Sequence, residues 1–345
     1  MNNLLTKLSV GLLTLGLASA TITSHAADVR LSERAQAAIA AKDGEKVKLI
    51  LTYRQPPGLS DEDDIKGNAG KLHRSFRLIP GHAIEIPAKA AEKLLQNNPN
   101  IAHVSLDEPL TAASTTSLPT PVGHGYPELF NLPYTGAGVG VAVIDSGVKS
   151  HPDLKPNVSV SFLGKTDDKY GHGNHVAGII AGNGKHSEGP YRGVAPDAYM
   201  INVRVLDDQG VGLASDVIAA LDWVLLNKDQ YDIRVVNLSL GHPVVEPAAT
   251  DPLVQAVEAV WDAGVVVVAS AGNAGHDGYG TITSPGNSSK IMTVGSLTHW
   301  GDEDPMNDII STYSSRGPTL LDHVVKPDLL APGNRVISLK AKDAY

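Results

Sequence analysis

The stretch Val139-Gly-Val-Ala-Val-Ile-Asp-Ser-Gly147 decides the fold of this 345-residue chain. Residues 139–144 form a nearly continuous apolar run, which is typical of a strand buried on both faces of a parallel sheet. The run stops at Asp145, and a serine and a glycine follow it. A buried strand with a polar end is characteristic of α/β proteins, which bind ligands at the carboxyl edge of the sheet.

Similar apolar runs recur towards the C-terminus and alternate with amphipathic segments. They predict strands at residues 139–144, 198–205, 235–239 and 265–269, and helices at residues 172–182, 214–227 and 252–262. Right-handed crossovers bring the carboxyl ends of parallel strands to one edge, so Asp145, Ser239 and Asn273 should meet there. The predicted fold class is α/β, with a parallel β-sheet flanked by helices.

A smaller module precedes this fold. Its sequence predicts strands at residues 46–53, 82–87 and 101–106, an acidic surface loop at residues 56–64, and a helix at residues 88–97 with Leu94 and Leu95 inward. These elements predict a small α+β domain over residues 27–110. Residues 111–124 are rich in Ser, Thr and Pro and predict a flexible linker, which leaves residues 125–345 for the larger domain.

The first 26 residues predict an export signal. Lys7 is their only charged side chain, residues 8–20 are mainly apolar, and the small residues Ser24 and Ala26 precede the expected cut. The apolar run is shorter than the roughly 20 residues that a membrane-spanning helix needs, and it contains two glycines. We therefore expect a secreted protein, extracellular or periplasmic, with no membrane span in the mature chain.

The composition excludes several classes of function. Lys and Arg number 28 and Asp and Glu 37, and residues 116–345 hold 15 basic and 25 acidic side chains. This balance argues against a nucleic-acid partner, because nucleic-acid binding requires a basic patch. Cysteine is absent, which removes disulfides, thiolate metal sites, iron–sulfur clusters and cysteine nucleophiles. Any nucleophile must therefore be an oxygen or a nitrogen.

Each polar motif also has a purely structural explanation. Asp145-Ser-Gly147 fits an ordinary turn after a strand. Gly171-His-Gly-Asn-His175 fits one buried and one surface histidine at the start of a helix, or a pair of metal ligands, although the His-Glu-x-x-His motif of zinc proteases is missing. Gly272-Asn273 fits a loop that needs a positive φ. Taken singly, these motifs leave the function open.

In combination the motifs resemble those of the subtilisin-like serine proteases. The matching segments are Val141-Ala-Val-Ile-Asp-Ser-Gly147, His151-Pro-Asp-Leu154, Gly171-His-Gly-Asn-His-Val-Ala-Gly178, Arg192-Gly-Val-Ala-Pro196, Val236-Asn-Leu-Ser-Leu-Gly241, Ser270-Ala-Gly-Asn273, Ser314-Ser-Arg-Gly-Pro318 and Ala331-Pro-Gly333. The resemblance extends over about residues 125–340 in the family's order. It implies a subtilisin-like fold, and residues 27–110 resemble, more loosely, the family's propeptide, which assists folding and inhibits the enzyme.

The resemblance also implies roles for individual residues. Asp145 would orient the imidazole of His172, the general base, and Asn273 would donate its amide to the oxyanion. His172 is preferred over His175 because it holds the first position of His-Gly-x-His. Substrate binding is implied for Ser239, Leu240 and Gly241, for Ala271 and Gly272, and for Gly286 in the wall of the primary pocket.

Partners and ions follow from the same resemblance. The expected partners are protein or peptide substrates, together with the chain's own propeptide as an intramolecular inhibitor. No cofactor is expected to be required. Asp153 matches a position that often binds structural calcium in the family, although an ordinary solvated carboxylate explains it equally well. Asn174 stands where the family usually has Thr, and we expect only a local change in hydrogen bonding there.

The expected nucleophile is missing from the sequence. The family's order is Asp, His and then Ser, and the serine should follow Ala331-Pro-Gly333 in a Gly-Thr-Ser-Met-Ala-Ser-Pro-like motif. Twelve residues follow Gly333, and none forms this motif. Gly286-Asn-Ser-Ser289 is only superficially similar. We therefore expect a C-terminally incomplete peptidase domain that is inactive as given.

Three interpretations remain. The first is a truncated record of an active secreted endopeptidase precursor, a zymogen. The second is a catalytically dead binding or decoy protein that uses the substrate cleft. The third is a metal-dependent hydrolase that uses His172 and His175.

Overall fold

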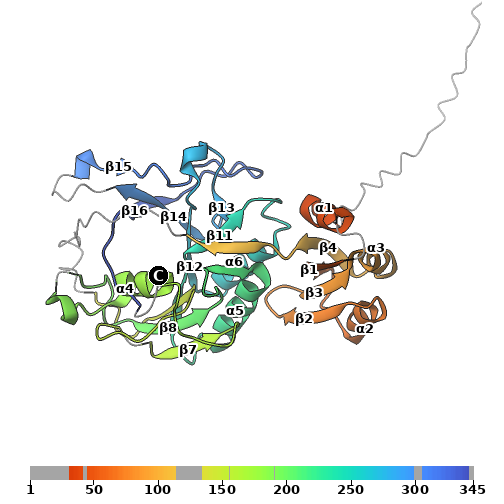
Figure 1. Cartoon of the computed structure of the whole chain (residues 1–345), viewed down its shortest axis with the longest axis horizontal. Helices are drawn as coiled ribbons and strands as arrows, with labels where there is room; N and C mark the ends of the chain where they lie inside the picture. Colours follow the sequence, from red (N-terminus) through yellow and green to blue (C-terminus); the bar gives the residue numbers. More distant parts are fainter. Residues whose placement is uncertain are drawn as a thin grey trace, which may run out of the picture.

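The computed structural model describes residues 31–41, 45–113, 134–154, 156–189, 191–298 and 305–341. The predicted export signal, residues 1–26, and most of the predicted linker lie outside the described residues, so both stay predictions. Within the described residues, no helix combines the length and the apolar character needed to cross a bilayer. The described chain forms one large sheet with helices, and a smaller sheet that precedes it (Figure 1).

The larger sheet has eight strands, and most of them are parallel. Six parallel strands lie side by side in the order β7 (Val158–Ser161), β8 (Tyr199–Arg204), β6 (Gly140–Asp145), β10 (Ile233–Leu238), β12 (Val266–Ser270) and β14 (Met292–Thr298). β14 also pairs with parallel β16 (Leu329–Pro332) and antiparallel β15 (Ile309–Ile310). Every residue of β6 is buried, as its apolar run predicted. The predicted α/β fold class is confirmed.

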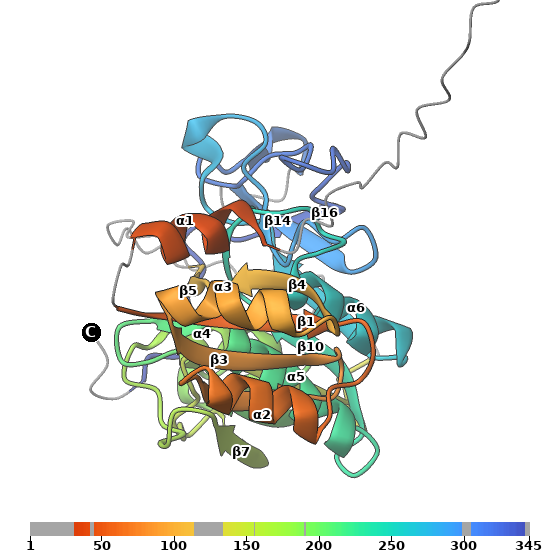
Figure 2. The same ribbon diagram turned by 90° about the vertical axis from the view of Figure 1, so that its right-hand side faces the viewer.

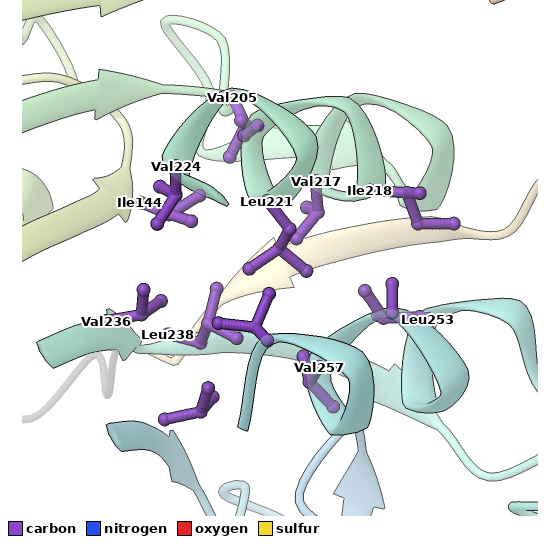
Figure 3. Packing of buried hydrophobic residues seen from close by; sticks show 14 of the residues in the cluster. Ile144, Val205, Val217, Ile218, Leu221, Val224, Val236, Leu238, Leu253 and Val257 are labelled. Atoms are coloured by element: carbon purple, nitrogen blue, oxygen red, sulfur yellow. The ribbon is translucent and has the colours of Figure 1, made fainter. Parts of the chain in front are cut away.

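Helices cover both faces of this sheet. α5 (Ala214–Asn227) and α6 (Pro252–Asp262) pack on one face, where Ile144 of β6 and Leu238 of β10 meet Leu221 of α5 (Figure 3). α4 (His172–Ala181) packs on the other face, in a cluster that contains Val143. Because successive strand residues point to opposite faces, Asp145 shares the side of Val143 and therefore faces α4.

The smaller module is an antiparallel sheet with three helices. Its strand order is β2-β3-β1-β4. The elements are α1 (Glu33–Ala41), β1 (Lys46–Tyr53), α2 (Leu59–Gly67), β2 (Lys71–Phe76), β3 (Gly81–Pro87), α3 (Ala88–Asn97) and β4 (Ile101–Leu106). The module has a hydrophobic core of its own, and Leu94 and Leu95 are buried in it as predicted. Neither α1 nor β2 was among the elements predicted from the sequence.

The prediction of an acidic surface loop over residues 56–64 is wrong, because α2 begins at Leu59. The carboxylate of Asp61 accepts a hydrogen bond from the Gly58 amide at 2.8 Å, which caps the first turn. Acidic side chains are favoured at a helix N-terminus by the helix dipole, so the same acidic residues that suggested a loop stabilise a helix. Ile65 is fully buried and anchors α2 to the sheet.

A third sheet joins the two modules. β5 (Pro109–Ala112) leaves the smaller module and lies between β11 (Leu240–Pro243) and β9 (Val211–Leu213), and β13 (Thr283–Ser284) completes the order β13-β11-β5-β9. The predicted linker therefore cannot begin at Thr111, since Thr111 and Ala112 are paired strand residues. Their strand conformation comes from partners 100 or more positions away in the sequence, which local composition does not reveal.

The smaller module also packs directly on α5, since Phe76 and Ile79 share a buried cluster with Leu221, and α5 lies behind this module in the view of Figure 2. The carboxylate of Asp107 accepts hydrogen bonds from the amide of Ser215 at 2.9 Å and from its hydroxyl at 2.7 Å, which caps the start of α5 from outside the helix. Burial raises the pKa of Asp107. Arg74 forms an ion pair with Asp216 one residue further along. The two modules are thus joined by polar contacts as well as by β5.

Candidate active site

The carboxyl edge of the larger sheet brings Asp145 and His172 together. Asp145 is the last residue of β6 and is fully buried, and His172 is the first residue of α4. The Nδ1 atom of His172 lies 2.8 Å and 2.9 Å from the two carboxylate oxygens of Asp145. A carboxylate only accepts hydrogen bonds, so Nδ1 donates its proton and Nε2 is left to face the opposite side of the ring.

Opposing effects set the pKa of His172. Burial lowers it, but the charge of Asp145 and the hydrogen bond to it act in the other direction. The backbone of Ala113, which accepts a hydrogen bond from the ring, and the charge of Asp168 add to this effect. The pKa of His172 is therefore raised above its ordinary value, and the site favours a positively charged imidazole.

An extended strand lies against this histidine. β5 pairs antiparallel with β11, with Ala112 opposite Leu240 and Thr111 opposite Gly241. The amide of Ala113 donates to the carbonyl of Ser239 at 2.8 Å. On its other edge β5 pairs with β9, so that an extended peptide is held from both sides. Ser239, Leu240 and Gly241 thus form a sheet edge that holds a peptide next to His172.

The loops after β12 form the neighbouring wall. Ala271 and Gly272 follow β12 directly, and the Thr283 amide donates to the Ala271 carbonyl at 3.0 Å. Gly272 has a φ of +105°, and a Cβ there would lie 2.7 Å from Thr283 and 2.8 Å from Ser315, so a side chain does not fit. The buried Gly286 is fixed through its carbonyl, which accepts a 2.7 Å hydrogen bond from the hydroxyl of Thr293.

Asn273 follows Gly272 and is half-buried. Within the described residues its side-chain amide makes no hydrogen bond, so the amide remains able to donate to a ligand. The sequence reasoning missed two parts of this site: β5 itself, and Thr283, whose side chain lies between the backbones of Gly241 and Gly272. The local sequence carries no signal for β5, whose residues form a strand because β9 and β11 pair with them.

His175 and Asp153 serve local structure. The Nε2 atom of His175 is hydrogen-bonded to the carbonyl of Val336 at 3.0 Å, and burial lowers the pKa of this ring. Asp153 accepts a hydrogen bond from the amide of His186 at 2.7 Å. The described part of the chain contains no group of three or more His, Cys, Asp or Glu side chains that could hold a metal. Calcium also binds carbonyl oxygens, so calcium binding at Asp153 stays a prediction, and we derive no metal-dependent step.

Comparisons with known proteins agree with this geometry. Residues 136–344 match the model of the subtilase family. The chain is 39% identical over 292 residues to serine protease AprX of Bacillus subtilis, which covers 81% of this chain and 65% of that protein. It is 34% identical over 291 residues to M-protease of Shouchella clausii (83% and 68%) and 32% identical over 317 residues to subtilisin E of Bacillus subtilis (89% and 76%).

The chain thus spans slightly less than two thirds of AprX and more of the other two relatives. The family match includes β6, α4 and the edge strand β11, which together form the site around His172. On these grounds the chain belongs to the subtilase family of serine proteases.

Proposed function

We propose that the chain is the precursor of a secreted serine endopeptidase that hydrolyses peptide bonds in proteins. The observation that carries this proposal is the position of His172. Its ring is hydrogen-bonded to Asp145 on one side and to the backbone of Ala113 on the other. A substrate that pairs with β11 as β5 does presents its carbonyl to the same imidazole. This chemistry requires no cofactor.

Each side chain then has a defined task. His172 takes a proton through Nε2 from the attacking hydroxyl and returns it to the leaving amine. Asp145 keeps the proton on Nδ1 and stabilises the charged ring, and Asn273 donates to the oxyanion. Among the described residues, no serine hydroxyl is hydrogen-bonded to His172, whose Nδ1 contacts Asp145. The described residues therefore do not supply the serine whose hydroxyl would attack.

That observation also favours a second candidate function. A subtilase without its nucleophile can still bind extended peptides between β9 and β11, as it binds β5. Such a protein would act as a binding or decoy module. The intact Asp145–His172 pair is the reason to prefer the protease, because a pure binding role does not need it.

We further propose that the smaller module is a propeptide that inhibits the site through β5. Pairing with β11 and the hydrogen bond to the His172 ring support Ala113 as the residue before the scissile bond, and we propose a cut between Ala113 and Ser114. Leu110 is fully buried beside β9, which predicts a preference for substrates with leucine three positions before a small residue.

Expression of the complete natural reading frame, through its own stop codon, tests the proposal. The secreted product should begin at Ser114 by N-terminal sequencing and should digest casein, and a serine-directed fluorophosphonate should block the digestion. The His172→Ala variant should stay uncut. An uncut product that binds peptides without hydrolysing them would instead establish the binding protein. Hydrolysis that survives the fluorophosphonate but not a chelator would establish a metal-dependent enzyme.

A further inference from the structure

A second carboxylate, Asp168, is buried behind the Asp145–His172 pair. It is 0% exposed and precedes α4 by four residues. Its Oδ1 accepts hydrogen bonds from the Ser146 hydroxyl at 3.0 Å and from the Gly171 amide at 2.7 Å, and its Oδ2 accepts one from the Asn174 amide at 2.8 Å. Burial and the charge of Asp145 raise the pKa of Asp168, and the three donated hydrogen bonds oppose this and favour the ionised carboxylate.

Ser146 connects this carboxylate to both members of the pair. Its amide donates to the Oδ1 of Asp145 at 2.7 Å. Its hydroxyl donates to Asp168 and accepts a hydrogen bond from the amide of Gly173 at 2.9 Å. One serine therefore links the carboxylate that holds the imidazole with the helical turn that carries it.

Asn174 makes a second connection between the same two segments. Its Oδ1 accepts from the Lys149 amide at 2.6 Å, and its Nδ2 donates to the Lys149 carbonyl at 2.9 Å. An amide side chain can form these two hydrogen bonds with the backbone of one residue, because it carries an acceptor and a donor on separate atoms. A threonine has a single hydroxyl, which cannot reach both the amide and the carbonyl of Lys149. Gly173 lies so close that a Cβ there would be 2.0 Å from the Gly147 carbonyl, so the helix and the loop are in direct contact.

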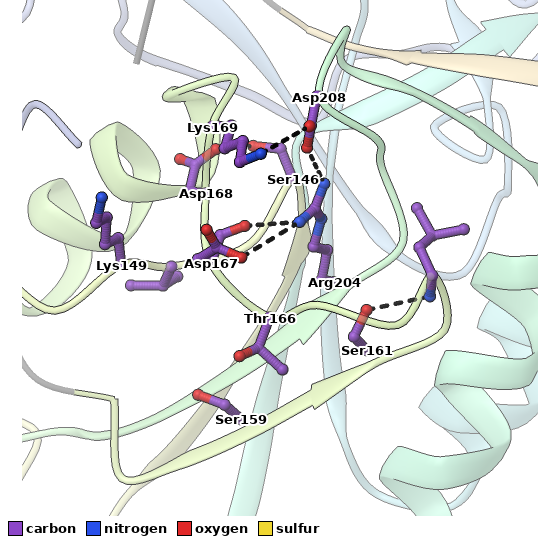
Figure 4. Close-up of polar contacts among 12 residues, drawn as sticks. Ser146, Lys149, Ser159, Ser161, Thr166, Asp167, Asp168, Lys169, Arg204 and Asp208 are labelled. Atoms are coloured by element: carbon purple, nitrogen blue, oxygen red, sulfur yellow. Dashed lines mark hydrogen bonds and ion pairs between the residues drawn. The ribbon is translucent and has the colours of Figure 1, made fainter. Parts of the chain in front are cut away.

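The segment that carries Asp168 is itself fixed from β8, as Figure 4 shows. Arg204 donates to the carbonyl of Asp167 at 2.8 Å and forms an ion pair with Asp208 at 2.6 Å. Lys169 pairs with the same Asp208. Hydrogen bonds therefore connect Asp168 and its neighbour Asp167 to the first turn of α4 on one side and to β8 on the other.

We propose that Asp168 is a positioning residue of the Asp145–His172 pair, which acts through Ser146 and the first turn of α4, with Asn174 as the second connection. The inference rests on the proposed function only in taking this pair as the catalytic one. Its buried charge also favours the charged imidazole. The other titratable groups that face this ring are Asp145 on β6, His175 on α4, and Tyr170, whose ring centroid lies 6.5 Å away.

The test is an NMR titration of the 345-residue chain labelled with ¹⁵N-histidine, with the His172 signals assigned through His172→Gln. In Asp168→Asn the midpoint of the His172 titration should move to lower pH. Asp167→Asn is the matched control, because that carboxylate is 39% exposed and lies 3.9 Å from Arg204, and it should leave the midpoint unchanged. A merely structural role for Asp168 would lower the melting temperature of Asp168→Asn without moving the midpoint, and that result would overturn the proposal.

A second variant covers the case in which Asp168→Asn does not fold. Ser146→Ala keeps both carboxylates and removes only the hydroxyl that links Asp168 to Gly173. The downfield signal of the His172 Nδ1 proton, which reports its bond to Asp145, should broaden or disappear in this variant, and an unchanged signal would contradict the proposal. Neither measurement uses hydrolysis, so failure of the proposed protease function would be recognised separately.

Discussion

Several opposing electrostatic effects act on the pKa of His172. Burial lowers its pKa, and the charge of Asp145, the bond to Asp145 and the bond to the Ala113 backbone more than compensate. A histidine whose folded pKa is raised contributes stability that is fully present below its unfolded pKa of about 6.5. This contribution is lost as the pH rises through the folded pKa, because the ring then gives up the proton that binds β5.

The first prediction is that β5 loosens as the pH rises through the raised pKa of His172. The neutral ring keeps its proton on Nδ1, which donates it to Asp145. Nε2 then has a lone pair in place of the N–H group that donates to the Ala113 backbone. Hydrogen exchange of the Ala112 and Ala113 amides, expressed as protection factors, should show falling protection across this range. In His172→Gln, which cannot become charged, the protection should not depend on pH. Protection that is constant with pH in the unaltered chain would contradict the prediction.

At the scale of elements, β5 shows how one strand can serve both folding and inhibition. Its pairing with β9 and β11 satisfies backbone groups on both edges, and Leu110 is buried in the core that contains α5. Pairing fixes the register, and the buried leucine fixes which face of β5 points inward. The position of Ala113 beside His172 is therefore a consequence of how Leu110 packs.

The second prediction follows from this packing. Leu110→Ala should lower the free energy of unfolding by about 2–5 kcal/mol, because a buried leucine leaves a cavity when it is truncated. Thr111→Ala is the matched control, since the Thr111 side chain is exposed, and it should change the same free energy by less than about 0.5 kcal/mol. Urea unfolding followed by circular dichroism measures both. If both changes lowered the free energy of unfolding equally, Leu110 would not be the residue of β5 that packs into the core.

For the molecule as a whole, the parts that the sequence predicts are those with a local signal. The apolar run before Asp145 and the periodic helix over residues 214–227 are each specified by neighbouring residues, so β6 and α5 lie where they are expected. Thr111 and Asp168 have no such signal. Thr111 is a strand residue only because β9 and β11 lie beside it, and Asp168 acquires its contacts from Ser146 and the turn at Gly171.

The third prediction concerns the connection between the two modules. Residues 118–124 can be replaced by the recognition sequence of a site-specific protease and then cut. The two parts should stay together in size-exclusion chromatography, because β5 is paired on both edges and Asp107 is bonded to Ser215 at the start of α5.

The association should also survive about 0.5 M salt, because salt screens mainly exposed charges, and the Arg74–Asp216 pair that joins the modules is largely buried, with side chains 28% and 10% exposed. The cut Leu110→Ala chain should dissociate at a lower urea concentration than the cut unaltered chain, since it loses the buried leucine of β5 but keeps the ion pairs and the packing of Phe76 and Ile79 in the core around α5. If salt alone separated the unaltered parts, the ion pairs would be the main connection between the modules, and inhibition through β5 would need a different physical basis.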